Sequence, residues 1–201
     1  MSREARSEPA AEARPNSASV PSSPSPAAAA RVVLDATGIQ RALMRVAHEI
    51  LERDVLPEKL VLIAVAQGGI PVAELLAERL REIAEIEVPL GTLDVTLYRD
   101  DVIASGRRPI PSPTRIPVSV TGRSVVLVED VVFTGRTVRA AMDAVIDFGR
   151  PAEIRVATLV DRGHRELPIR VDFVGKNIPT ARNQTVLLQR NSAGQLEVVV
   201  Q

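Results

Sequence analysis

The sequence predicts an α/β fold in which a mainly parallel sheet is flanked by helices, and two observations carry this prediction. Short, continuous apolar runs rich in β-branched residues, such as 125–128, indicate strands buried on both faces, because side chains on both sides of such strands are apolar. Segments with apolar residues at helical spacing alternate with these runs. This alternation is typical of parallel sheets that are covered by helices.

The first half of the chain is expected to contain three strands and two helices. The strands are predicted over 32–34, 60–66 and 88–98. Asp35 or Thr37 can cap the first helix, and Pro71 suits the first turn of the second. The apolar faces of the two helices are formed by Ile39, Leu43, Val46, Ala47 and Ile50, and by Val72, Leu75, Leu76 and Leu80.

The second half begins with a loose, proline-containing segment over 99–122. The strand over 124–128 follows, and a helix is predicted from Thr137 until Gly149 and Pro151 end it. The apolar face of this helix is formed by Val138, Ala141, Met142 and Val145. The remaining strands are predicted over 154–160, 171–174, 185–189 and 197–200.

Composition narrows the class of protein. The 201 residues suffice for one α/β domain, and the lack of cysteine excludes disulfides and thiolate metal sites. No apolar stretch is long enough to span a membrane, so no membrane partner is expected. The 25 basic and 25 acidic residues balance, so an RNA site would need a local basic patch. Residues 1–30 predict a disordered tail without signal-peptide features, which favours a cytoplasmic protein.

The most informative segment is 125–137, where a strand, two carboxylates, a Thr-Gly-Arg-Thr turn and a helix follow one another. The turn joins the carboxyl end of a strand to the amino end of a helix, where free N–H groups and the helix dipole favour a phosphate. Gly135 lets the backbone approach closely, and Thr134 and Thr137 add hydroxyl donors. The segment therefore predicts a phosphate-binding turn.

Glu129 and Asp130 stand directly before this turn. Ionised carboxylates only accept hydrogen bonds, so the pair suits the hydroxyls of a ribose. The complete order predicts a site for a phosphorylated sugar. The alternative interpretation is a strand–turn–helix unit whose acidic turn is simply solvated. A Gly-Arg-Thr sequence without the preceding strand and acids would favour this alternative.

This segment resembles the phosphoribosyl pyrophosphate (PRPP) motif of type I phosphoribosyltransferases, and residues 92–101, 160–170 and 174–180 resemble signatures of the PyrR family. For residues 31–201, the similarity implies one phosphoribosyltransferase domain of the type I fold, which includes a small hood. Members of this family regulate pyrimidine genes by binding their leader mRNA in response to uridine nucleotides (UMP or UTP). They also convert uracil and PRPP to UMP and pyrophosphate, with Mg²⁺ bound through PRPP.

The resemblance also implies roles for the motif residues. The 5-phosphate is assigned to the turn residues Thr134, Gly135, Arg136 and Thr137. The ribose hydroxyls are assigned to Glu129 and Asp130. A loop that comprises Tyr98, Arg99, Asp100 and Asp101 is expected to close over the site. In it, Arg99 is expected to contact pyrophosphate, and a neighbouring carboxylate to lie near Mg²⁺. A solvated turn is the alternative for the two aspartates of this loop.

Pyrophosphate and base contacts are assigned to Arg162, His164 and Arg165, and backbone groups at Val160 and Ile178 are expected to read uracil. The residues assigned to catalysis are Arg99, Asp100, Asp130 and Arg162. The alternative is that the two arginines pair on the surface with Asp161 and Glu166 and that the histidine is solvated.

One position departs from the family pattern. Members usually carry an Arg-Gly pair in the pyrophosphate loop after the second strand, whereas this chain has Gly68-Gly69 there. A guanidinium that could bind pyrophosphate through two hydrogen bonds is absent at that position, although backbone N–H groups can still bind it. We expect weakened PRPP affinity or turnover.

The first predicted helix carries Arg41, Arg45 and His48 in one stripe, opposite its apolar face. The resemblance makes this stripe a candidate for RNA phosphates. A solvated helix with an Arg45–Glu49 pair is the alternative. Met44, at the edge of the stripe, suits an interface between subunits of a homo-oligomer, either a dimer or a higher assembly.

Three functions remain open at this level. The first is a uracil phosphoribosyltransferase that also regulates through RNA. The second is a nucleotide-sensing, RNA-binding regulator with little or no transferase activity, which the Gly68-Gly69 pair favours. The third is transfer to another base such as hypoxanthine or guanine, against which the PyrR-like segments argue.

Overall fold

Five strands form the central sheet in a computed structural model that describes residues 30–53, 56–65, 67–99 and 113–201. The strands are β2 (Leu60–Val65), β3 (Leu90–Leu93), β4 (Ser124–Val132), β5 (Glu153–Asp161) and β6 (Phe173–Asn177). They are all parallel, in the order β3-β2-β4-β5-β6. The predicted parallel sheet is confirmed, whereas the predicted tail up to residue 29 lies outside the described residues.

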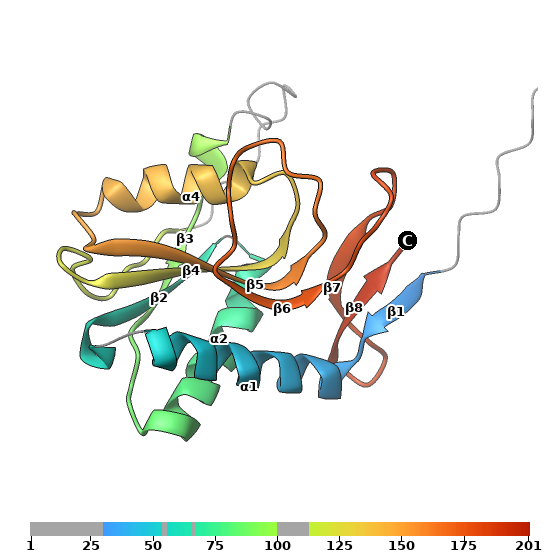
Figure 1. The fold of residues 1–201 in the computed structure, drawn as a ribbon, viewed down its shortest axis with the longest axis horizontal. Helices are drawn as coiled ribbons and strands as arrows, with labels where there is room; N and C mark the ends of the chain where they lie inside the picture. Colours follow the sequence, from blue (N-terminus) through green and yellow to red (C-terminus); the bar gives the residue numbers. More distant parts are fainter. Residues whose placement is uncertain (1–29, 54–55, 66, 100–112) are drawn as a thin grey trace, which may run out of the picture.

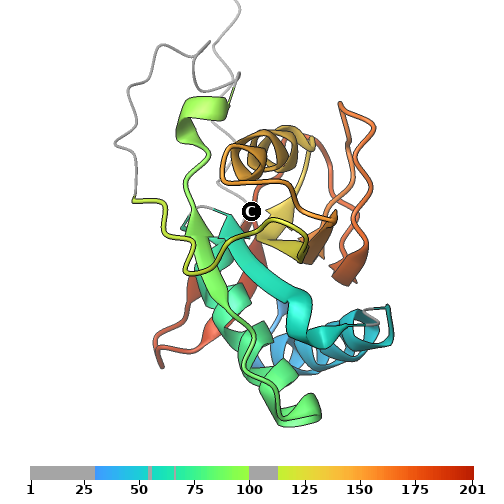
Figure 2. The same ribbon diagram turned by 90° about the vertical axis from the view of Figure 1, so that its left-hand side faces the viewer.

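Helices cover both faces of this sheet. The helices α1 (Ala36–Arg53) and α2 (Gly69–Ala84) pack on one face, and α4 (Arg136–Ile146) packs on the other (Figures 1 and 2). Asp35 caps α1, because the Gly38 N–H donates to its Oδ1 over 2.7 Å. Within the described part of the chain, no helix is long and apolar enough to cross a membrane.

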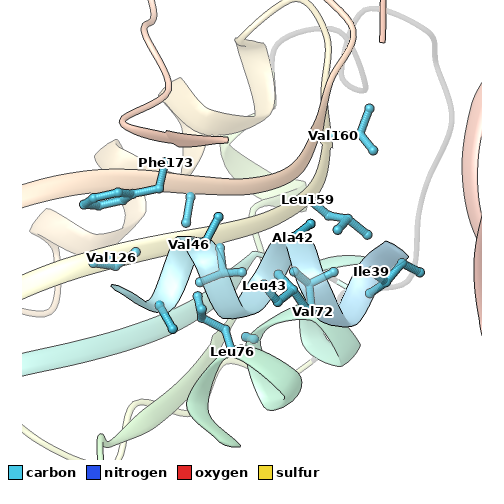
Figure 3. Packing of buried hydrophobic residues seen from close by; sticks show 14 of the residues in the cluster. Ile39, Ala42, Leu43, Val46, Val72, Leu76, Val126, Leu159, Val160 and Phe173 are labelled. Atoms are coloured by element: carbon cyan, nitrogen blue, oxygen red, sulfur yellow. The ribbon is translucent and has the colours of Figure 1, made fainter. Parts of the chain in front are cut away.

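Alternation along β4 sends successive side chains to opposite faces. Val126 and Val128 join the core cluster that contains α1 and α2, which is shown in Figure 3. Val125 and Leu127 join the cluster that contains α4. The strand therefore delivers the next two residues to different sides of the sheet.

A second, antiparallel sheet forms the hood, which consists of β1 (Arg31–Leu34), β7 (Val186–Arg190) and β8 (Leu196–Val200) in the order β1-β8-β7. Figure 1 shows it beyond the carboxyl ends of the central strands. Val186, Val198 and Val200 extend the core cluster of α1 and α2 into the hood. The two sheets consequently share one hydrophobic core.

Several predicted boundaries were wrong. The strand predicted over 88–98 ends at Leu93, because the Asp94 side chain accepts a hydrogen bond from the Thr96 N–H (2.7 Å) and turns the chain into the 3-10 helix η2 (Thr96–Tyr98). The strand predicted over 124–128 continues to Val132, since it stays paired with β5. The strand predicted over 171–174 is β6, which begins two residues later.

Candidate functional site

The turn after β4 adopts the geometry that the sequence predicts. Gly135 has a φ of 90°, in the left-handed region that favours glycine, and α4 begins at Arg136. The turn opens into a cavity of about 320 Å³. The cavity is lined by Arg99, Glu129, Val131, Phe133, Thr134, Gly135, Arg136, Thr137 and Glu166. The structure thus brings the phosphate turn, the first of the two acids and Arg99 together.

Glu129 follows the α4 face of the sheet and is only 8% exposed. Burial, and secondly the charge of Asp130, raise the pKa of its carboxyl to about 8, although Arg99 acts in the opposite direction. The sequence predicted an ionised carboxylate here, but the buried position favours the protonated form at neutral pH. Its Oε2 is buried without a hydrogen-bond partner, so the carboxyl presents an unsatisfied polar atom at the cavity.

Asp130 follows the opposite face, towards α2. A Cβ at Gly68 would lie 2.5 Å from Asp130 Oδ2, so the carboxylate reaches the first residues of α2. Burial raises the pKa of this carboxyl, while backbone hydrogen bonds lower it. A Cβ at Gly69 would run into the carbonyl oxygen of Val128, so this glycine permits close packing of α2 on β4. The amino ends of α2 and α4 therefore flank the acid pair from two sides.

The segment after β5 wraps around the phosphate turn. The Arg165 guanidinium donates to the Phe133 carbonyl (2.7 Å) and to Asp161 Oδ2 (2.6 Å), and so holds the turn against β5. The Arg165–Asp161 pair of the alternative interpretation is therefore present, although it is partly buried and does not lie on the open surface. The Glu166 N–H donates to the Thr134 carbonyl (2.9 Å), and its carboxylate pairs with Arg136. The sequence predicts Glu166 only as an ion-pair partner, because its place in the cavity depends on this wrapping.

Arg162 is buried, with 7% of its surface exposed, and does not line the cavity. Its guanidinium lies 4.1 Å from the centroid of the Phe133 ring and donates to the Gln184 carbonyl (2.7 Å). It also donates to the Ala181 carbonyl and Thr180 Oγ1. His164 Nε2 lies 2.6 Å from the Thr180 carbonyl oxygen. These contacts give Arg162 and His164 a role in holding the segment before β7, and the catalytic role expected of Arg162 stays a prediction.

Other predicted residues lie elsewhere. The Tyr98 hydroxyl donates to Asp147 Oδ2 (2.6 Å) at the carboxyl end of α4, away from the cavity. Val160 is buried within β5, and the Ile178 N–H already donates to the Asp161 carbonyl (2.9 Å). The predicted uracil contacts at these two positions stay predictions. Asp100 and Asp101 lie outside the described residues.

The basic stripe of α1 lines a second hollow. Arg41 and His48 are exposed, whereas Arg45 is already engaged by Glu49 and by the carbonyls of Val174 (2.9 Å) and Gly175 (2.7 Å) on β6. The Arg45–Glu49 pair of the alternative interpretation is therefore present. Arg45 also satisfies backbone acceptors on an edge strand, a role that sequence spacing does not reveal.

Comparison with known proteins identifies the family. The phosphoribosyl transferase domain family matches residues 32–189. A bifunctional protein PyrR of Geobacter sp. (strain M21) is 52% identical over 78% of this chain and 89% of that protein. The chain belongs to the PyrR family. A bifunctional protein PyrR of Deinococcus radiodurans is also 52% identical, over 83% of this chain and 91% of that protein.

Solved structures agree on the fold. A hypoxanthine phosphoribosyl transferase of Trypanosoma cruzi superposes with a TM-score of 0.65 over 85% of this chain and 90% of that one, at 25% identity. A hypoxanthine-guanine phosphoribosyltransferase of Bacillus anthracis gives 0.61 over 74% and 84%, at 24% identity. The predicted type I phosphoribosyltransferase fold, family and transferase class are confirmed.

Proposed function

We propose that this protein transfers the 5-phosphoribosyl group of PRPP to uracil and regulates pyrimidine genes by binding their leader mRNA. One observation supports the transferase half most directly. The amino ends of α2 and α4 flank Glu129 and Asp130, so two positions that favour phosphate stand on either side of groups that suit a ribose. PRPP has this order of groups, with a phosphate on carbon 5 and a pyrophosphate on carbon 1.

The reaction breaks the bond between carbon 1 and a pyrophosphate oxygen, and a ring nitrogen of uracil forms the new bond and loses its proton. The transition state resembles an oxocarbenium ion, so no protein nucleophile is needed. Thr134, Gly135 and Thr137 would fix the 5-phosphate, and Arg99 would neutralise pyrophosphate. Most of the rate would come from this positioning.

Mg²⁺ fits such a site as a partner of the substrate. No cluster of three or more metal-ligating side chains occurs among the residues that the structure describes. Mg²⁺ prefers oxygen ligands and keeps several waters, so pyrophosphate oxygens would provide most of its ligands and Asp130 an outer contact. The ion would supply charge neutralisation of the leaving pyrophosphate.

The transferase proposal is tested by incubating the protein with radiolabelled uracil, PRPP and Mg²⁺ and measuring UMP. Formation of UMP, with no product from hypoxanthine or guanine under the same conditions, is the expected result. Tight UMP binding without turnover would favour the nucleotide-sensing regulator. Product from a purine base in place of uracil would contradict the proposed specificity.

The RNA half rests on the stripe of α1. A hollow of about 500 Å³ there is lined by Gln40, Arg41, Met44, Arg45, His48 and Arg79. Arg45 already binds groups of the protein, so a substitution there would disturb the fold as well as RNA binding. We therefore test the phosphate contact at Arg41. Arg41→Gln should weaken leader RNA binding. It should also lower, by roughly one, the magnitude of the slope of log affinity against log salt concentration. The control is Arg139→Gln, on α4 across the sheet. Equal effects of the two substitutions would contradict RNA binding by the stripe of α1.

We further propose a homo-oligomer in the cytoplasm. Exposed apolar side chains support an interface near the carboxyl end of α4, namely Ile146, Phe148 and, on η2, Leu97. Tyr98 and Asp147 join these two elements through their hydrogen bond. Light scattering on the purified protein tests this, and a monomer at micromolar concentration would contradict it.

A further inference from the structure

The arginine of the phosphate turn is paired with a carboxylate of the protein itself. Arg136 Nε donates to Glu166 Oε2 over 3.0 Å, and both side chains line the cavity of the turn. The pair is partly open to solvent, with 33% of the Arg136 side chain and 36% of the Glu166 side chain exposed. A carboxylate and a phosphate ester are both oxygen anions that suit a guanidinium. Either anion can therefore bind the Arg136 guanidinium.

The backbone ties Glu166 to the turn. Its N–H donates to the Thr134 carbonyl (2.9 Å), and the N–H of Leu167 reaches the same oxygen (3.3 Å). The side chain can change its rotamer, but its Cα stays beside the turn. A second cation is near, because Arg182 Nη1 lies 3.8 Å from Glu166 Oε1 on a side chain that is 67% exposed. The carboxylate thus has another partner when it leaves Arg136.

We infer that Glu166 competes with the bound phosphate for Arg136 and so sets the affinity of the turn for phosphate esters, most strongly for the dianion. This inference rests on the proposed phosphate-binding role of the turn. A dianion at the amino end of α4 would stand close to the Glu166 charge, and like charges at such a distance repel. Because the pair is partly exposed, solvent screens the repulsion and limits its effect on affinity to about 3- to 10-fold.

The test is calorimetric titration of ribose 5-phosphate into the wild type and Glu166→Gln. Glutamine keeps the shape and can still accept from Arg136, but it carries no charge. We expect binding about 3- to 10-fold tighter for the variant at pH 8, and a smaller gain at pH 5.5, where the phosphate is mostly a monoanion. The matched control is Asp143→Asn, which removes the carboxylate that pairs with Arg139 (3.0 Å) on the same helix, outside the cavity lining. Its affinity should equal that of the wild type.

A double-mutant cycle gives a second readout. Arg182→Gln removes the alternative partner of the carboxylate, so it should weaken ribose 5-phosphate binding about twofold in the wild type and leave Glu166→Gln unchanged. Equal losses in both backgrounds would overturn the inference, as would unchanged or weaker binding by Glu166→Gln. Failure of both wild type and Glu166→Gln to bind ribose 5-phosphate would overturn the phosphate-binding role of the turn, on which the inference rests.

Discussion

The carboxylate of Asp130 occupies the space that any side chain at Gly68 would need, since a Cβ there would lie 2.5 Å from Asp130 Oδ2. The role of Gly68 therefore goes beyond the absence of the arginine that the family resemblance led us to expect there. In this chain, the glycine lets an acid at the end of β4 lie against the amino end of α2, where the helix dipole favours a negative charge. The acid assigned to the ribose and the loop assigned to pyrophosphate depend on each other.

Gly68→Arg alone cannot test the missing guanidinium, because its Cβ would displace Asp130. We expect Gly68→Ala to lower kcat/KM for PRPP about tenfold, which corresponds to roughly 1.4 kcal/mol of transition-state stabilisation. Gly68→Arg should exceed Gly68→Ala if a guanidinium improves pyrophosphate binding. Steady-state kinetics of the two variants side by side measure this difference. Equal values for both would show that the arginine contributes nothing here.

Glu129 should make the fold less stable as the pH rises. Its pKa in the folded protein, about 8, lies above the ordinary value of 4.5, so between these values the folded state binds more protons than the unfolded state. The free energy of unfolding should consequently fall from pH 5 to pH 8.5, by an amount on the order of a few kcal/mol. Glu129→Gln should remove most of this fall. Urea unfolding at several pH values measures it, and parallel curves for both proteins would refute the assignment.

Gly135 and Gly163 provide a matched pair for testing the turn. Both have positive φ, 90° and 75°, but a Cβ at Gly135 would lie 3.1 Å from Ile169, whereas one at Gly163 would meet nothing within 4 Å. Each alanine substitution should cost about 1 to 2 kcal/mol of stability through backbone strain. Only Gly135→Ala should also weaken ribose 5-phosphate binding, by about tenfold. Similar binding losses in both variants would argue against a specific role of the turn.

Substitution of Arg162 should lower the free energy of unfolding and should affect kcat only through this loss of stability. Arg162→Met leaves the Gln184 carbonyl without its guanidinium donor and the Ala181 carbonyl with only the Gln184 N–H, which should cost about 2 to 4 kcal/mol. Hydrogen exchange over 178–185 should accelerate. Arg182→Met, an exposed arginine of the same segment, is the control. A large fall in kcat with unchanged unfolding free energy and exchange would instead support the catalytic role predicted from the sequence.

Local signals in the sequence were sufficient for much of this protein. The 2-residue and 3.6-residue periods of the apolar residues predicted most strands and all three helices named here, because burial of one face or of both leaves a direct record in the chain. The phosphate turn was also predictable. Its strand, Gly135 and helix are consecutive, so no distant residue is needed to form it.

Tertiary structure alone decided what those residues do. The pKa of Glu129, the contact of Asp130 with Gly68, the burial of Arg162 under the segment before β7 and the pairing of Arg136 with Glu166 all join parts of the chain that only folding brings together. A sequence specifies which groups are present and how they repeat. Whether a charge is buried, neutralised by a neighbour or left open to a ligand depends on the three-dimensional arrangement of those neighbours, because electrostatic and steric effects act through space and over short distances.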